Sequence, residues 1–153
     1  MLTINLLHGI KPNALLQSIH DNLSVYYKNN IEWSLNYRIG YILFLTSYSK
    51  LNPTVQEDFY AELEKCIDHF EEKKSDYSLF GGITGLGWLL QYLNSKKLVH
   101  DDDIESLVKL DSLIYESLEV DEMNIKYDLF FGLIGKGLYF LKRPKSDLVT
   151  FRS

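Results

Sequence analysis

The sequence predicts an all-α protein of three helical hairpins, and three observations support this fold class. Segments with apolar residues every three or four positions alternate with shorter segments that are apolar on nearly all faces. A glycine-rich motif recurs after 50 residues. No segment shows the two-residue alternation of a half-buried strand. We therefore expect amphipathic helices that cover a layer of apolar helices.

Three amphipathic helices are expected, at residues 14–27, 59–70 and 104–118. Each of them follows residues that favour the start of a helix. These start signals are Pro12 with Asn13, Pro53 with Thr54, and Asp101–Asp103. The charged residues of these segments lie mostly away from the apolar stripe, so we expect a charged outer face on each helix.

Three apolar segments, at residues 41–45, 88–93 and 138–141, are expected to form buried inner helices. Pro144 is expected to end the last of them, because proline cannot continue a helix. The large aromatic residues of the second and third segments are predicted to lie in the core. They are Trp88, Tyr92, Tyr139 and Phe140.

Composition and charge set limits on the function. The 153 residues are expected to form a single helical-repeat domain, residues 1–153, and 46% of them are hydrophobic, enough for a core. The formal net charge of −5 argues against a nucleic-acid partner, because a phosphate-binding surface is basic. The sequence shows no secretory signal, and no apolar run reaches the roughly 18 residues of a membrane span. We predict a cytoplasmic protein, and the abundance of Tyr, Asn, Ile and Lys indicates a bacterial source.

The glycine-rich motif begins at Tyr77 and again at Tyr127. The first copy reads Tyr-Ser-Leu-Phe-Gly-Gly-Ile-Thr-Gly-Leu-Gly and the second reads Tyr-Asp-Leu-Phe-Phe-Gly-Leu-Ile-Gly-Lys-Gly. Six of the eleven positions are identical, which indicates a true repeat. The shared glycines are Gly82, Gly85 and Gly87 in the first copy, and Gly132, Gly135 and Gly137 in the second.

These glycines need a physical reason, because glycine inside a helix costs about 0.8–1.0 kcal/mol relative to alanine. We expect each motif to form the loop and first turn that open an inner helix. Gly82 and Gly132 are predicted to take positive φ at the turn. The other four are predicted to let neighbouring inner helices approach closely. Tyr77 and Tyr127 are expected to pack or hydrogen-bond at the rim of the cavity.

A nucleotide site is the functional alternative for a glycine-rich motif. The dinucleotide fingerprint is Gly-x-Gly-x-x-Gly after a strand, whereas this motif has the reverse spacing, Gly-x-x-Gly-x-Gly, without a predicted strand before it. In the second copy the residue after Lys136 is glycine, not the serine or threonine of a phosphate-binding loop. The motif therefore does not predict nucleotide binding.

The two motif copies, each followed by an apolar helix, resemble the repeat of lanthionine synthetase C-like (LanC-like) proteins. The resemblance covers about residues 13–143. It implies an α/α toroid of roughly seven hairpins, of which this chain would be the amino-terminal part, a partial ring of about three. The chain would then be a fragment or truncated form of a larger toroid. The resemblance also implies thioether formation in a precursor peptide, the chemistry of lantibiotic biosynthesis.

The family's zinc site is not found in this sequence. The resemblance implies two cysteines and a histidine as zinc ligands, in motifs of the carboxy-terminal half that do not occur here. We therefore predict no catalytic residue, metal ligand or cofactor in this chain, and expect zinc only in a full-length family member. The chain alone is expected to be inactive.

Two other functions stay open at this stage. A non-catalytic helical scaffold would bind a peptide or protein partner, or a second copy of itself, through inner helices left uncovered. An unrelated α/α toroid, such as a glycosidase, would need paired carboxylates or acidic metal motifs on its inner loops. Asp101–Asp103 is the one such acidic cluster, and it leads an outer helix instead. This second alternative ranks last.

The cysteine and histidine residues are the candidate metal ligands of this sequence. Cys66 and His69 have the Cys-x-x-His spacing of a metal site on one helix, but Cys66 falls on the apolar stripe and is predicted to be buried. His8, His20 and His100 are isolated in the sequence. No metal site is predicted from them.

Overall fold

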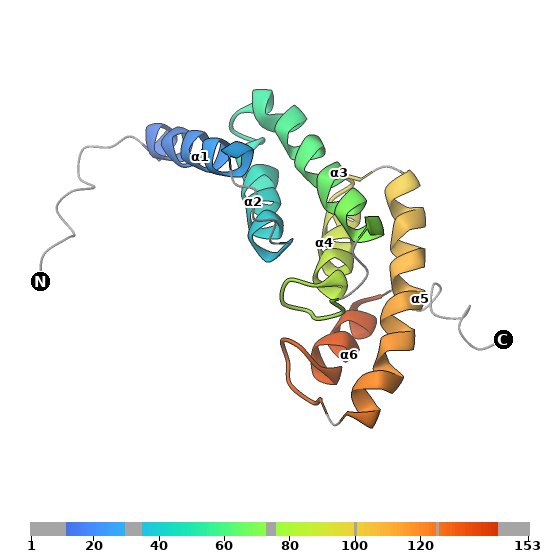
Figure 1. The fold of residues 1–153 in the computed structure, drawn as a ribbon. Coiled ribbons are helices and arrows are strands. Elements are labelled where there is room, and N and C mark those ends of the chain that lie inside the picture. The colour runs from blue at the N-terminus through green and yellow to red at the C-terminus, as the bar shows by residue number, and fades with distance from the viewer. Residues whose placement is uncertain (1–11, 30–34, 73–75, 100, 125, 144–153) are drawn as a thin grey trace, which may run out of the picture.

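The computed structural model describes residues 12–29, 35–72, 76–99, 101–124 and 126–143, and no strand occurs among them. The elements are α1 (Pro12–Asn29), α2 (Leu35–Tyr48), the short 3-10 helix η1 (Pro53–Val55), α3 (Gln56–Glu72), α4 (Ile83–Ser95), α5 (Asp101–Met123) and α6 (Leu133–Lys142) (Figure 1). The predicted all-α fold is confirmed. Pro144, His8 and His100 lie outside the described residues.

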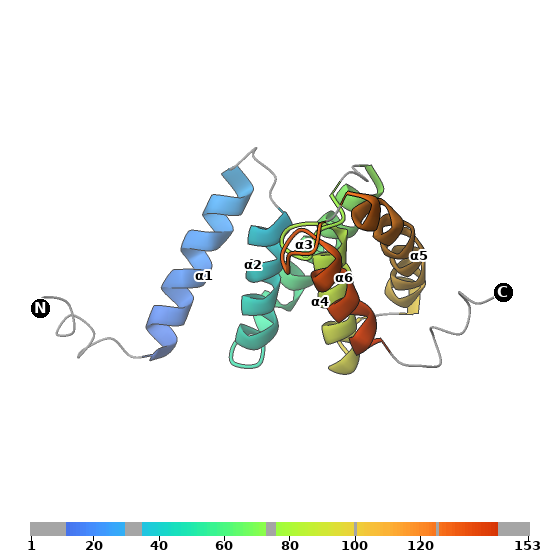
Figure 2. The same ribbon diagram turned by 90° about the horizontal axis from the view of Figure 1, so that it is seen from below.

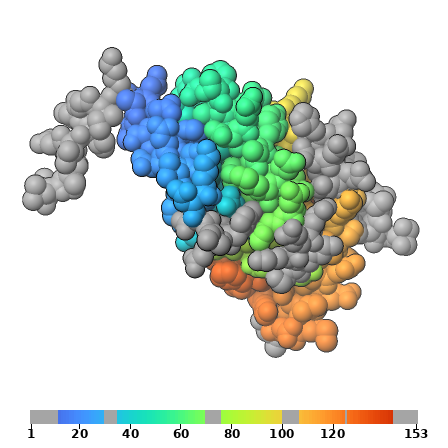
Figure 3. All heavy atoms as spheres, turned by 45° about the horizontal axis from the view of Figure 1, so that its top comes forward, coloured from blue at the N-terminus to red at the C-terminus, as the bar shows by residue number. Residues whose placement is uncertain are grey.

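Three helices form an inner layer. α2, α4 and α6 are neighbours in that order, and we name them the inner helices (Figures 1 and 2). α3 packs mainly on α2, and α5 packs mainly on α4. On the face drawn in Figure 3, α3 lies between α1 and α5. Each of α3 and α5 therefore covers the inner helix of the preceding hairpin.

Leucine and isoleucine side chains from both layers make the core. Leu86, Leu89, Leu90 and Leu93 of α4 are at most 1% exposed. In α5, Leu107, Leu110 and Ile114 are also at most 1% exposed, and they belong to the same core cluster. Burying side chains of this size stabilises a fold by about 1.5–3 kcal/mol each. The contact between α4 and α5 is therefore a main source of stability.

The helix starts follow the sequence signals with one addition. α5 begins at Asp101, as the acidic cluster predicts. Pro53 and Thr54 form η1 ahead of α3, and the side chain of Asn52 caps it by accepting a hydrogen bond from the Thr54 amide at 3.3 Å. Asparagine favours this position, but it was not among the predicted start signals.

The prediction for the core aromatics is correct for Tyr139, which is 0% exposed, and wrong for Trp88, which is 42% exposed. α4 uses its leucine face for packing, and Trp88 lies on another face of the same helix. Leu138 and Leu141 of α6 are likewise exposed. An apolar segment is thus covered only where a neighbouring helix meets it. No helix in the described part of the chain combines the length and the apolar character that a membrane crossing requires.

Candidate functional site

The two glycine motifs form equivalent corners at the start of α4 and α6. In the first corner the Ile83 amide donates a hydrogen bond of 2.8 Å to the carbonyl of Asp76. In the second, the Leu133 amide donates one of the same length to the carbonyl of Lys126, 50 residues later. Each loop therefore folds back onto the first turn of the helix that follows it.

The backbone at the helix start departs from the prediction. Gly82 and Gly132 are N-caps with φ of −108° and −125°, so the predicted positive φ is wrong for both. Positive φ occurs instead at Gly81, with φ of +94°, and the second copy has Phe131 at the matching position. The two caps are crowded by backbone instead. A Cβ on Gly82 would lie 2.5 Å from the Ser78 amide nitrogen, and one on Gly132 would lie 2.3 Å from the Lys126 oxygen.

The next glycine of each motif has the same role in both copies. A Cβ on Gly85 would lie 2.5 Å from the carbonyl oxygen of Leu79, and a Cβ on Gly135 would lie 2.1 Å from that of Leu129. Both distances are far below van der Waals contact. These glycines therefore let the corner loop close against its own helix, rather than serving mainly as contacts between inner helices.

The last glycine differs between the copies. A Cβ on Gly87 would lie 2.8 Å from a ring carbon of Tyr139, so α4 and α6 approach closely at this point. No atom lies within 4 Å of the Cβ position of Gly137. The predicted close approach of inner helices is therefore found at Gly87 and is not found at Gly137.

The two corners touch each other. The Phe80 amide donates a hydrogen bond of 3.0 Å to the Phe130 carbonyl, and the ring of Phe80 meets the rings of Phe130 and Phe131 edge to face. All three rings are more than half exposed. We name Phe80, Phe130 and Phe131 the aromatic corner.

A pocket of about 470 Å³ lies beside the aromatic corner, between the corner loops and α5. Its floor holds a buried ion pair, in which the ammonium of Lys136 lies 2.6 Å from the carboxylate of Asp121. We name this the corner pocket. It is lined by Asp76, Tyr77, Ser78, Leu113, Glu116, Ser117, Val120, Asp121, Lys126, Phe131 and Lys136.

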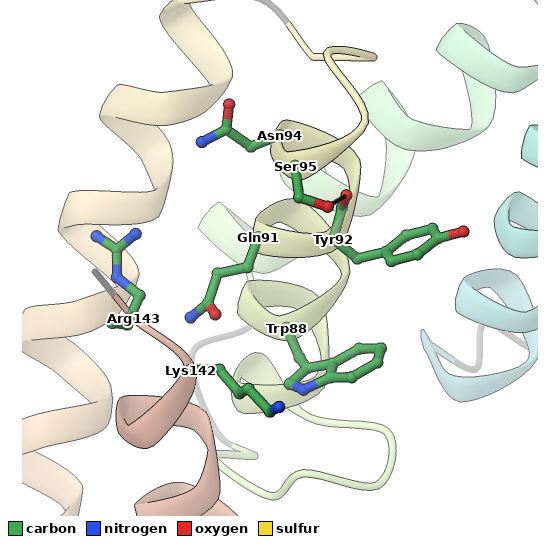
Figure 4. Close-up of a pocket in the computed structure, with 7 residues that line it drawn as sticks. All are labelled: Trp88, Gln91, Tyr92, Asn94, Ser95, Lys142 and Arg143. Carbon is green, nitrogen blue, oxygen red and sulfur yellow. Dashed lines mark hydrogen bonds between the residues drawn. The ribbon is translucent and has the colours of Figure 1, made fainter.

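A second pocket, of about 460 Å³, lies between α4 and the end of α6 (Figure 4). The rings of Trp88 and Tyr92 lie parallel within 2°, with their centroids 6.4 Å apart. We name this the inter-helix pocket. It is lined by Trp88, Gln91, Tyr92, Asn94, Ser95, Lys142 and Arg143.

A buried polar network lies behind the inter-helix pocket. The Tyr139 hydroxyl donates a hydrogen bond of 2.5 Å to Asp111, and the guanidinium of Arg143 pairs with the same carboxylate. Burial, followed by the hydrogen bond to Asp111, raises the pKa of Tyr139 far above its ordinary value. Tyr139 therefore stays protonated at neutral pH and serves to join α6 to α5.

The candidate metal ligands do not come together in the described structure. Cys66 is fully buried, as predicted, and burial raises the pKa of its thiol to about 12. His20 contacts Asp58 at 3.3 Å and Asp21 at 3.4 Å and packs against Tyr48. Among the described residues, no group of three His, Cys, Asp or Glu side chains could hold a metal ion. These residues do not fit the zinc site that the resemblance implies.

Burial of Cys66 is expected to protect its thiol from alkylation in the folded protein. It is also expected to make the folded protein less stable at high pH. The folded thiol keeps its proton above pH 9.0, where the unfolded thiol loses it. The free energy of unfolding should therefore fall as the pH rises from 9 toward 12, by about 1.4 kcal/mol per pH unit from this group. Iodoacetamide labelling, read by mass spectrometry, should be slow in buffer and fast in urea. Equal labelling rates in the two conditions would contradict the burial.

The two motif tyrosines have different surroundings. Tyr77 is half-buried in the corner pocket, where the Lys136 ammonium lies 5.8 Å from its ring centroid. Tyr127 is 53% exposed. Tyr77 therefore lines the corner pocket, and Tyr127 lines neither the corner pocket nor the inter-helix pocket. Lys136 was not predicted to line a pocket. The available signal was that it stands where the first copy has Leu86, because a lysine at a buried position needs a charged partner.

Comparison with known proteins connects these features to a family. The model of the family described as lanthionine synthetase C-like protein matches residues 38–152. No curated protein matches the chain, and no solved structure does. The matched residues run from α2 to beyond α6 and include both glycine corners and both pockets. The helical hairpins agree with the toroid repeats of this family, and the chain belongs to the LanC-like family.

Proposed function

We propose that this chain supplies hairpins to a peptide-modifying cyclase that forms thioether rings in a precursor peptide, in the cytoplasm of a bacterium. In this reaction a cysteine thiol adds across the carbon–carbon double bond of a dehydrated serine or threonine. The sulfur bonds to the β-carbon and the proton goes to the α-carbon, so no atom is lost. The mass of the peptide stays the same while one thiol disappears.

The repeated glycine corner is the observation that carries this proposal. Both copies lie within the part of the chain that the family model matches, and both make the same backbone hydrogen bond and the same close approach to a carbonyl. This corner sets the start of each inner helix. The proposal assigns the chain a positioning role, with the zinc ligands on residues beyond those described here.

Thiol alkylation tests the proposed activity. The full-length product of the gene that carries this sequence is incubated with zinc and a synthetic peptide that contains one dehydrobutyrine and one cysteine. We expect the fraction of peptide that reacts with N-ethylmaleimide to fall with time at constant peptide mass. A peptide with alanine in place of dehydrobutyrine is the control and should keep its thiol. A full-length protein that leaves both thiols reactive would refute the cyclase proposal.

A scaffold without catalysis is the second candidate, and the uncovered inner helices favour it. Leu138 and Leu141 of α6 are 43% and 80% exposed, and Trp88 of α4 is 42% exposed. Exposed apolar surface of this kind marks sites of interaction. A scaffold would leave the thiol reactive in this assay and would still bind the peptide, so the thiol reading together with a separate binding measurement distinguishes the two candidates.

A further inference from the structure

The aromatic corner is an apolar surface that nothing in the described structure covers. Phe80, Phe130 and Phe131 are 53%, 52% and 58% exposed, although their rings contact one another. Exposed phenylalanine side chains lose favourable burial, and aromatic residues are enriched where proteins bind partners. A surface that gathers three of them is therefore a candidate docking site.

Backbone hydrogen bonds hold this corner in place before any partner binds. The Asp128 carboxylate accepts hydrogen bonds from the amides of Phe130 and Phe131, at 2.9 and 2.6 Å. The bond from the Phe80 amide to the Phe130 carbonyl then fixes the first corner to the second. A surface that is already ordered loses little conformational entropy on binding, so a short segment is enough to bind it.

The charge next to the aromatic corner selects the partner. Phe131 is also a wall of the corner pocket, so the aromatic and charged surfaces are continuous. Within that pocket Lys136 neutralises Asp121. Of the remaining charged residues of its lining, Asp76 and Glu116 are acidic and Lys126 is basic, and the Asp76 carboxylate also accepts a hydrogen bond of 2.8 Å from the Ser78 amide. Asp128 adds a carboxylate at the base of Phe131. The unbalanced charge is negative and suits a cation.

We propose that the aromatic corner and the corner pocket together bind a cationic segment of the peptide substrate. A lysine or arginine side chain enters the corner pocket toward Glu116 and Asp76, and a neighbouring aromatic or aliphatic residue packs on the three phenylalanine rings. The pocket volume of about 470 Å³ leaves room for such a side chain. The inference rests on the proposed function, because it assumes a peptide ligand, and it adds the charge class of that peptide.

Fluorescence anisotropy on the full chain tests this inference with a defined probe. The probe is a labelled peptide of alternating lysine and phenylalanine residues separated by glycine, and the comparison peptide has glutamate for each lysine. We expect the lysine probe to bind at least about tenfold more tightly than the glutamate probe, and its affinity to fall as salt is added. F131A and E116K should each weaken the lysine probe by about tenfold.

Two matched variants control for general effects of the substitutions. Y26A removes an aromatic ring of α1 that is 51% exposed, and E64K reverses an exposed charge in the middle of α3. Neither residue lies at the corners, so both variants should bind the lysine probe within about twofold of the parent chain, the range of a surface substitution without a contact. Circular dichroism of all four variants verifies that each is folded.

Three outcomes overturn the inference. Equal affinity for the two probes refutes the charge selection, and equal weakening by F131A and Y26A refutes the location. A sedimentation experiment that shows a dimer of the parent chain and a monomer of F131A assigns the corner to a second copy. The binding assay requires no ring formation, so it fails or succeeds independently of the thiol assay that tests the cyclase proposal.

Discussion

Replacing Gly135 by alanine is expected to lower the free energy of unfolding by about 3 kcal/mol, at the upper end of overpacking effects. The added Cβ would lie 2.1 Å from the carbonyl oxygen of Leu129 and 2.9 Å from the Cβ of Leu79. Neither atom is the free end of a flexible side chain, so the corner loop itself must move. Urea unfolding of the full chain, followed by circular dichroism, measures the loss.

Gly137 provides the matched control for this substitution. It lies two residues further along α6, and nothing is within 4 Å of its Cβ position. Alanine there should stabilise the protein by about 0.5–1 kcal/mol, because alanine favours the helical conformation more than glycine. If the two variants unfold at the same urea concentration, crowding at the corner is not what requires Gly135.

Replacing Asp121 by alanine is expected to cost about 3–5 kcal/mol, as is usual when one partner of a buried ion pair is removed. The side chain of Lys136 is 2% exposed, and its ammonium lies 2.6 Å from the Asp121 carboxylate. Its other polar contact, with the carbonyl of Ser117, is longer at 3.4 Å. Without Asp121 the ammonium would be left with a poorly balanced charge in a buried site. Thermal unfolding of the full chain measures this effect.

The double variant with Asp121 changed to leucine and Lys136 changed to methionine separates charge from packing. Two apolar residues of similar size need no compensation, so most of the lost stability should return. The first motif copy supports this expectation for the lysine, because Leu86 stands where the second copy has Lys136 and is fully buried. A double variant as unstable as the single one would show that the aspartate side chain itself is needed.

Much of the fold could be predicted because the signals are local. The spacing of apolar residues predicted the six helices α1 to α6, and the repeat predicted the two corners. The corner loop can close against its helix only where a glycine lies beside the loop carbonyl, so the same glycine occurs in both copies. The exposure of Trp88 could not be predicted in this way. Periodicity finds an apolar helix, but which of its faces a neighbour covers depends on contacts between distant segments.

The candidate site was predicted less completely. The positive φ was expected at Gly82, because that glycine is shared by both copies, yet it occurs at Gly81, whose counterpart is Phe131. At the cap and the first turn of each helix, the glycines shared by both copies are therefore crowded positions rather than left-handed ones, whereas Gly137 is shared without being crowded. The corner pocket depends on how α5 and α6 meet the corner loops, and the inter-helix pocket depends on how α4 meets the end of α6. No spacing in the sequence encodes these arrangements.

The offset packing of α3 on α2 and of α5 on α4 affects how the protein comes apart. Each strongly packed pair joins the second helix of one hairpin to the first helix of the next, so the cooperative unit straddles two hairpins. A protease cut at the short link between α2 and α3, or between α4 and α5, would leave the α2–α3 and α4–α5 interfaces intact, and these are the largest ones. Loss of α5 would instead expose buried leucine side chains of α4. Amides of α4 are accordingly the ones that should exchange with solvent most slowly.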